Sequence, residues 1–218
     1  MYKLYYAPST ASLAVHWMLI ELKVDFELVL VDFGTKAQKS AEYLRINPSG
    51  HVPTLVLDGV PHFECAALLM LLAERHPEAG FQPSIGTPER PAYFQWMFYL
   101  ANTLQPAFRN WFYPEEAAGL ENSAATMAHA RTKIEGAWER LDKLLQDGRP
   151  FMLGQRLTAL DFLATMLTRW SRNMPVPATE FPRVARYVNH MRAMPSLREV
   201  HIRENLTDWI NDGARPAS

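Results

Sequence analysis

The stretch NPSGHVPTLVLDGVPHF, residues 47–63, holds two short apolar runs separated by a turn. Thr54–Leu57 and Val60–Phe63 have the β-branched and aromatic content that is typical of strands. Asp58-Gly59, between them, is a strong signal for a two-residue hairpin loop. The NPSG segment before both runs is a further turn signal. The stretch therefore predicts an antiparallel hairpin that the chain enters through a turn.

The residues on both sides of this hairpin alternate between strand and helix patterns. The predicted elements are a strand over Met1–Tyr6, a helix over Ser12–Lys23, a strand over Phe26–Val31, a short helix around Tyr43, and a helix over Glu64–Arg75 closed by His76-Pro77. The order is β-α-β-α-β-β-α, so the first two strands should be parallel and joined by a crossover helix. This order predicts a thioredoxin-like α/β domain over residues 1–77.

Only helical patterns follow this first domain. Residues 78–88 hold Gly80, Pro83, Gly86 and Pro88, and are predicted to form a linker. The predicted helices cover Glu89 to about Trp111, Asn122–Gln146, the apolar run opened by the capping-box pattern Thr158–Asp161, Pro182–Arg192 and Ser196–Trp209. We therefore expect an all-α helical bundle domain over residues 89–218.

The composition is that of an ordinary globular protein, with 218 residues, 48% hydrophobic and 21% charged, and a net charge of -1. This charge argues against nucleic-acid binding, which needs a clustered basic surface. The single cysteine, Cys65, forms no intramolecular disulfide, which favours a reducing compartment. No apolar run approaches the roughly 20 residues of a membrane helix, and Pro8 interrupts any signal peptide. We expect a cytoplasmic protein without a membrane segment, and no metal, because no cluster has ligand spacing.

Hydroxyl side chains cluster between Tyr5 and Ser12, in the sequence YYAPSTAS. Ser9, Thr10 and Ser12 precede or open the first predicted helix, where such residues commonly cap the backbone or stabilise turns. The alternative is that one of them acts on a ligand at the helix N-terminus, where the helix dipole favours negative charge. The residues by themselves leave both interpretations open.

Three motifs and one capping box occur in an order and at spacings that together form a strong signal. They are Tyr5-Tyr6-Ala7-Pro8 followed by Ser12-Leu13, Ile46–Pro53, Phe63–Ala67 leading to Leu72–Pro77, and Thr158–Asp161. With them, essentially the whole chain resembles the cytosolic glutathione transferase family, and its bacterial, beta-like members in particular. Three positions depart from the beta pattern, because Ala11 replaces a cysteine, Gln105 a histidine and Cys65 a serine. Beta-class cysteine chemistry is therefore not expected at Ala11.

The resemblance singles out Ser12 as the catalytic hydroxyl that stabilises the glutathione thiolate. A hydrogen bond to a charged group is worth about 1.5–3 kcal/mol, which lowers the thiol pKa by about one to two units. Tyr6 is the rival, because other branches of the family use a tyrosine near the end of the first strand. Tyr5 alternates to the opposite face and is expected to be packed.

The resemblance also implies a set of glutathione-binding residues. Val52-Pro53 would be a cis peptide bond that exposes the Val52 backbone to the tripeptide as an added strand; otherwise the proline only opens a strand. Glu64 would hold the γ-glutamyl ammonium and the Cys65 backbone N–H its carboxylate; otherwise Glu64 is a favourable acid in a first helical turn. His51 would contact the glycine carboxylate, or else is a surface residue.

The segment Tyr93–Tyr113 holds nine aromatic residues. Most of them should belong to the core or to a subunit interface. Those after Pro106, which should break or kink the helix, are candidates for an apolar acceptor-substrate wall. The pocket residues we expect are Phe108, Trp111 and Tyr113, with Arg109 as an anion contact and Asn102 pointing inward.

The resemblance implies a detoxification enzyme in which glutathione is a co-substrate and no other cofactor is needed. The glutathione thiolate would attack a small apolar electrophile bound between the two domains. Family members are two-fold dimers, so we expect a homodimer. One alternative is a glutathione-dependent isomerase or lyase on the same scaffold, which would regenerate glutathione. A second alternative is a transferase-like scaffold that binds protein partners without catalysis.

Overall fold

The computed structural model describes residues 1–209, which divide into two compact units. The first unit contains residues 1–79 together with residues 191–209, and the second contains residues 80–190. The helical domain predicted from the sequence covers residues 89–218. Residues 210–218 of that domain lie outside the described residues. The structure differs from that grouping because the segment from residue 191 contacts the first unit.

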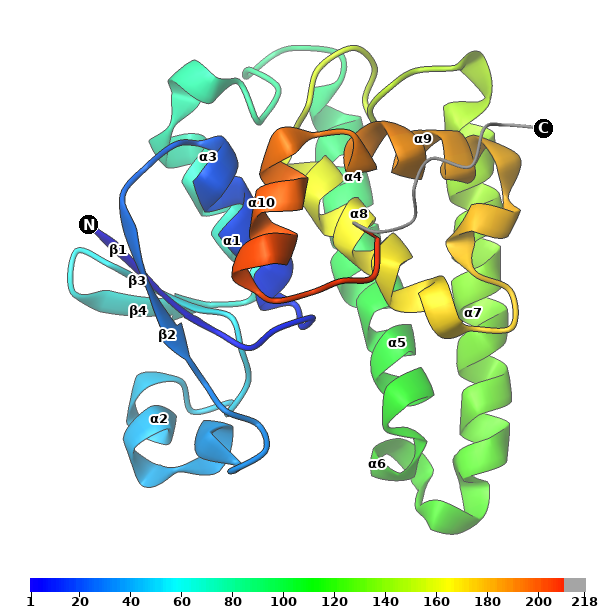
Figure 1. Cartoon of the computed structure of the whole chain (residues 1–218). Coiled ribbons are helices and arrows are strands. Elements are labelled where there is room, and N and C mark those ends of the chain that lie inside the picture. Colours follow the sequence, from blue (N-terminus) through cyan, green and yellow to red (C-terminus); the bar gives the residue numbers. More distant parts are fainter. Residues whose placement is uncertain (210–218) are drawn as a thin grey trace. The chain divides into compact units, whose positions relative to one another are not determined.

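The first unit is built on a four-stranded sheet in the order β2-β1-β3-β4 (Figure 1). The strands are β1 (Tyr2–Tyr6), β2 (Phe26–Leu30), β3 (Thr54–Leu57) and β4 (Val60–Phe63). β1 and β2 are parallel, and the other two pairings are antiparallel. Both turn residues of the β3–β4 hairpin are left-handed, with φ of 51° at Asp58 and 84° at Gly59, as the favoured two-residue loop requires. The predicted crossover and hairpin are both confirmed.

Two helices cover one face of this sheet, and a shorter one packs on the other (Figure 1). The helices are α1 (Ser12–Glu21) and α3 (Cys65–Arg75) on the first face and α2 (Ala41–Ile46) on the second. α1 is apolar on all sides and is buried from Ser12 through Ile20. On the second face, the rings of Tyr43 and Tyr5 lie 5.8 Å apart, so Tyr5 is packed as expected. The unit therefore has the predicted thioredoxin-like fold.

The helix α10 (Pro195–Arg203) packs along α1 and so belongs to the first unit. Its Leu197 and Val200 are buried. The indole Nε1 of Trp17 donates to the hydroxyl of Ser196 at 2.8 Å, which adds a buried polar contact between the two helices. The apolar side of α10, which includes Leu197 and Val200, is thus buried against the first unit.

The end of α10 is fixed by its backbone. The helix that was expected to run to Trp209 ends at Arg203, because Asn205 is left-handed with φ of 54°. The N–H groups of Asn205 and Leu206 bond back to carbonyl oxygens of the last turn at 3.1 and 2.8 Å. These two bonds form a Schellman motif, in which asparagine is one of the few residues that replaces glycine. The motif holds Glu204 at the C-cap.

The second unit is helical (Figure 1). Its helices are α4 (Arg90–Tyr99), α5 (Gln105–Phe112), α6 (Pro114–Ala118), α7 (Ser123–Leu144), α8 (Ala159–Trp170) and α9 (Pro182–Arg192), the last of which crosses the boundary at residue 191. Within residues 1–209, no helix combines the length and the apolar character that a bilayer span requires.

A π-helical turn over Leu100–Leu104 joins α4 to α5. The sequence predicted one helix interrupted at Pro106, and the structure shows how the chain accommodates this proline. Pro106 has no N–H, and its ring crowds the carbonyl four residues earlier. The N–H of Gln105 bonds to the carbonyl of Leu100, five residues back, so the turn widens and the chain remains helical on both sides.

Candidate functional site

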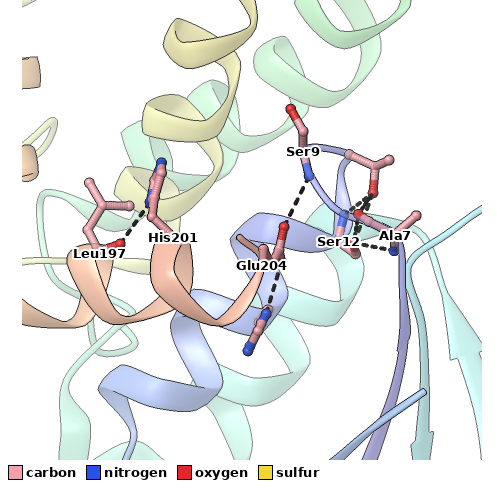
Figure 2. A network of polar contacts seen from close by, with 8 residues as sticks. Ala7, Ser9, Ser12, Leu197, His201 and Glu204 are labelled. Carbon is pink, nitrogen blue, oxygen red and sulfur yellow. Dashed lines mark hydrogen bonds and ion pairs between the residues drawn. The ribbon is translucent and has the colours of Figure 1, made fainter. Parts of the chain in front are cut away.

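Two hydroxyl side chains converge on the backbone of Ala7, directly after β1. The Ser12 hydroxyl donates to the Ala7 carbonyl at 3.0 Å and accepts from the Ala7 N–H at 3.2 Å. The Thr10 hydroxyl donates to the same carbonyl at 2.7 Å and lies 2.9 Å from the Ser12 Oγ. Figure 2 shows these contacts drawing residues 7–12 into a compact segment, which we call the Ala7–Ser12 turn.

The two hydroxyls lie at different depths. Ser12 is fully buried, at 0% exposure, and its Oγ is engaged by Ala7 and Thr10. Thr10 is partly exposed. The expected direct contact between Ser12 and a ligand therefore differs from what the structure presents, since the outward-facing hydroxyl of the pair is that of Thr10. Ser12 is also not the helix cap, because Ala11 occupies the N-cap of α1 and no side chain caps it.

Tyr6 ends β1 next to this turn. Its side chain is partly buried, and its ring stands edge-on to the ring of His16 with centroids 5.7 Å apart. Burial raises the pKa of the Tyr6 phenol, and the Glu204 carboxylate raises it further. The phenol is therefore protonated at neutral pH, and as a donor it remains the rival of the hydroxyl pair.

The connection between α2 and β3 is held by side chains of α2 and of the residue after it. The hydroxyl of Tyr43 donates to the His51 carbonyl at 2.6 Å, and the Asn47 amide donates to the same oxygen at 2.9 Å. The Val52-Pro53 peptide bond that follows is cis, as the resemblance implied. His51 is exposed, whereas Val52 and Pro53 are buried. The turn-rich sequence before β3 thus places this short segment beside the end of β1, to which β3 is paired.

The N-terminus of α3 begins with two residues of different character. Glu64 is exposed and left-handed, with φ of 72°, a conformation that non-glycine residues adopt at an energetic cost. Cys65 is buried, and its thiol donates to the carbonyl of Ala11 at 3.2 Å. Burial, assisted by the charge of Glu64, raises the pKa of the Cys65 thiol to about 12. The thiol is therefore protonated and is not a nucleophile.

The contact between Cys65 and Ala11 brings two helix N-termini together. Ala11 is the N-cap of α1 and Cys65 is the first residue of α3. The first turns of both helices carry backbone N–H groups without intrahelical partners, and both dipoles favour negative charge there. The first unit therefore has the features of an anion-binding site at this junction, with the acid Glu64 beside it for a cationic group.

The expected acceptor-substrate residues are dispersed in the second unit. Phe108 is fully buried among the rings of Phe112, Trp138 and Trp170, at centroid distances of 5.9, 6.1 and 5.6 Å. The expectation that Phe108 forms a substrate wall is therefore wrong: it is a core residue, because the π-helical turn and α5 direct it inward.

Arg109 already has a partner for its charge. Its Nε and Nη2 donate to the Glu116 carboxylate at 2.7 and 2.6 Å, and its guanidinium lies 4.1 Å from the ring centre of Tyr113. Tyr113 and Asn102 are exposed, and Trp111 is partly exposed. Of the predicted wall, these three remain available to a ligand.

Glu204 was not among the site residues predicted from the sequence. Its Oε2 accepts from the backbone N–H of Ser9 at 3.0 Å, and its Oε1 lies 2.9 Å from the Nδ1 of His16. Both side chains of the His16–Glu204 pair are fully buried. The one signal in the sequence was a histidine inside an otherwise apolar helix, which named no partner.

Comparison with known proteins identifies the family. Residues 1–74 match the N-terminal domain of glutathione S-transferases, and residues 124–190 match their C-terminal domain. Glutathione S-transferase GST-4.5 of Xanthomonas campestris pv. campestris is 34% identical over 178 residues, which cover 80% of this chain and 84% of that protein. The chain belongs to the glutathione S-transferase family.

Solved structures agree with this assignment. A glutathione transferase homologue from Sulfitobacter, with bound glutathione, has a TM-score of 0.85 and 27% identity, covering 93% of this chain and 98% of that one. The beta class glutathione S-transferase of Sphingomonas chungbukensis has a TM-score of 0.81 and 28% identity, covering 94% and 99%. The predicted resemblance to bacterial, beta-like members is confirmed.

Proposed function

We propose that this protein conjugates glutathione to a small apolar electrophile. The glutathione thiol loses its proton to solvent, and its sulfur donates an electron pair to an electrophilic carbon. A leaving group then departs from that carbon with its own bonding pair. The observation that carries the proposal is the meeting of the α1 and α3 N-termini at Ala11 and Cys65, since a thiolate and a carboxylate both suit that position.

The thiolate is stabilised by the Thr10–Ser12 hydroxyl pair. Two hydroxyls donate to the Ala7 carbonyl, so Thr10 can turn its proton toward sulfur while Ser12 keeps the carbonyl paired. Ser12 then acts through Thr10 and through the shape of the turn. Tyr6 is the other donor within the same region and is the alternative that the experiment must separate.

The peptide part of glutathione lies along the segment before β3. The γ-glutamyl ammonium of glutathione forms an ion pair with the Glu64 carboxylate. The γ-glutamyl carboxylate accepts a hydrogen bond from the Cys65 backbone N–H. The cis Val52-Pro53 bond supports an added-strand contact with the tripeptide backbone. The exposed side chain of His51 reaches the glycine carboxylate.

The electrophile is apolar and is met by exposed residues of the second unit, namely Asn102, Trp111 and Tyr113. Arg109 is not proposed as an anion contact, because Glu116 already balances its charge. The reaction needs no cofactor besides glutathione as co-substrate. We propose that the reaction takes place in the cytoplasm, since a reducing compartment keeps both glutathione and Cys65 as thiols. We also propose that the reaction serves detoxification and that the enzyme is a homodimer.

Three variants test the assignment of the donor. Glutathione binding is measured by calorimetry, and the conjugation rate is measured with a generic aryl halide. The pKa of the bound thiol is obtained from the ultraviolet absorbance of its thiolate. Losing one charge-assisted hydrogen bond of about 1.5–3 kcal/mol should cost roughly 10–150-fold in rate at neutral pH. We expect that loss in Thr10→Val, which keeps the side-chain shape, and a comparable one in Ser12→Ala.

Tyr6→Phe is the matched control. If Tyr6→Phe abolishes the thiolate signal while Thr10→Val and Ser12→Ala retain it, the donor is Tyr6. If the wild type binds glutathione and leaves aryl halides unchanged, product analysis with isomerisable substrates decides between a glutathione-regenerating enzyme and a binding scaffold.

A further inference from the structure

We propose that Glu204 is a positioning residue: from the end of α10 it holds the Ala7–Ser12 turn in its active shape, with His16 as its buried partner. The identity of the ligand bound at this turn rests on the proposed function, whereas the positioning of the turn by Glu204 does not.

Glu204 uses both of its carboxylate oxygens. The Ser9 N–H donates to Oε2 at 3.0 Å and the His16 Nδ1 lies 2.9 Å from Oε1, as Figure 2 shows for the labelled Ser9 and Glu204. A buried carboxylate is costly unless hydrogen bonds replace its water. Here one bond goes to a side chain of α1 and the other to the backbone of the turn, so Glu204 ties the two together.

Ser9 needs such a restraint. Its φ is 64°, in the left-handed region that is uncommon for a serine and persists only when the surroundings fix it. The residue that follows is Thr10, the partly exposed hydroxyl of the pair. The conformation of Ser9 therefore sets the orientation of Thr10 within the turn, and the Glu204 contact restrains Ser9 at its N–H.

The apolar packing of α10 on α1 does not explain why residue 204 is a glutamate. Leu197 and Val200 already bury the apolar side of α10, and Trp17 bonds to Ser196 at 2.8 Å. The Schellman motif that ends α10 fixes the backbone of Glu204 at its C-cap. An apolar residue there would dock the helix without the cost of burying a charge. The contacts with the Ser9 N–H of the turn and with His16 together supply the reason for a glutamate.

The test compares Glu204→Ala and Glu204→Gln with Ser196→Ala. Ser196→Ala removes the other buried polar contact between α1 and α10 and touches nothing in the turn. Hydrogen exchange of the backbone over residues 7–12 is measured without ligand, and kcat, KM and the pKa of bound glutathione with it. We expect Glu204→Ala to speed exchange in the turn, to lower kcat by roughly tenfold or more, and to raise the bound-thiol pKa by about one unit.

Ser196→Ala should leave the exchange of the turn, the thiol pKa and kcat near wild type. Glutamine replaces the charged carboxylate with one neutral oxygen and an NH2 group, so the bond from the Ser9 N–H is no longer charge-assisted. Glu204→Gln should therefore show the same changes in weaker form. Equal exchange in Glu204→Ala and Ser196→Ala overturns the proposal. If Glu204→Ala does not fold, wild-type exchange and thiol pKa in Glu204→Gln overturn it. Faster exchange in a protein that binds no glutathione supports the positioning and refutes the proposed function.

Discussion

At the scale of single residues, Cys65 shows how surroundings decide the chemistry of a side chain. Its thiol is buried, donates to the Ala11 carbonyl, and has a pKa raised to about 12. At pH 8 only about one thiol in ten thousand is ionised, and the thiolate is the form that alkylating reagents attack. We expect iodoacetamide to leave Cys65 unmodified in the folded protein and to alkylate it fully in guanidinium. Rapid labelling of the folded chain, read by mass spectrometry, would contradict this.

Glu64 carries a second prediction at this scale. Its proposed partner is the ammonium of glutathione, a part of the ligand that does not react. Glu64→Ala should therefore raise the glutathione dissociation constant about tenfold or more and leave kcat at saturating glutathione nearly unchanged. The control is Glu42→Ala, which removes an exposed acid from the first turn of α2. An unaltered dissociation constant in Glu64→Ala excludes Glu64 from the site.

At the scale of elements, the start of α8 is fixed by one buried carboxylate. Asp161 accepts from the backbone N–H groups of Thr158 and Met152 at 2.9 and 2.8 Å, and from the hydroxyls of Thr158 and Tyr187 at 3.0 and 3.2 Å. The first of these bonds belongs to the capping box that the sequence predicted. Asp161→Ala should lower the free energy of unfolding by about 2–4 kcal/mol, because a cap is lost and buried donors are left unpaired. Urea unfolding measures this.

The same carboxylate predicts a pH dependence of stability. Burial raises the Asp161 pKa to about 6, above its value of about 3.9 in an unfolded chain. The folded state thus holds the proton more tightly, so this contribution to stability is fully present below about pH 4 and is lost as the pH rises through about 6. We expect the unfolding free energy of the wild type to fall relative to Asp161→Asn, by up to about 3 kcal/mol between pH 4 and 7. If the difference in unfolding free energy between the two proteins does not change with pH, the Asp161 pKa is not raised in the folded state.

At the scale of the whole molecule, we expect a homodimer. Phe98 on α4 is 56% exposed, and Met70 and Leu71 on α3 are only partly buried in the single chain. Light scattering at micromolar concentration should give twice the mass of one chain, and Phe98→Glu should shift the protein toward a monomer. The control is Leu120→Glu, at an exposed apolar position outside α3 and α4. A monomer mass for the wild type rules the dimer out.

The sequence by itself determined what depends on near neighbours in the chain. Alternation, helical periodicity and turn residues predicted the hairpin over Thr54–Phe63, the crossover of the first two strands and the capping box at Asp161. The resemblance added the cis bond before Pro53. The hairpin and the capping box were predictable because each forms within a few residues of the chain. The crossover was predictable because a strand-helix-strand order favours parallel pairing of its two strands.

Only the tertiary structure decided the depth and the partners of the site residues. It buried Ser12 behind Thr10, moved Phe108 into the core, and joined Glu204 to Ser9. Local sequence does not contain this information, because exposure is set by every element that packs around a side chain. A contact between the two ends of a chain becomes specified only when the fold has brought those ends together.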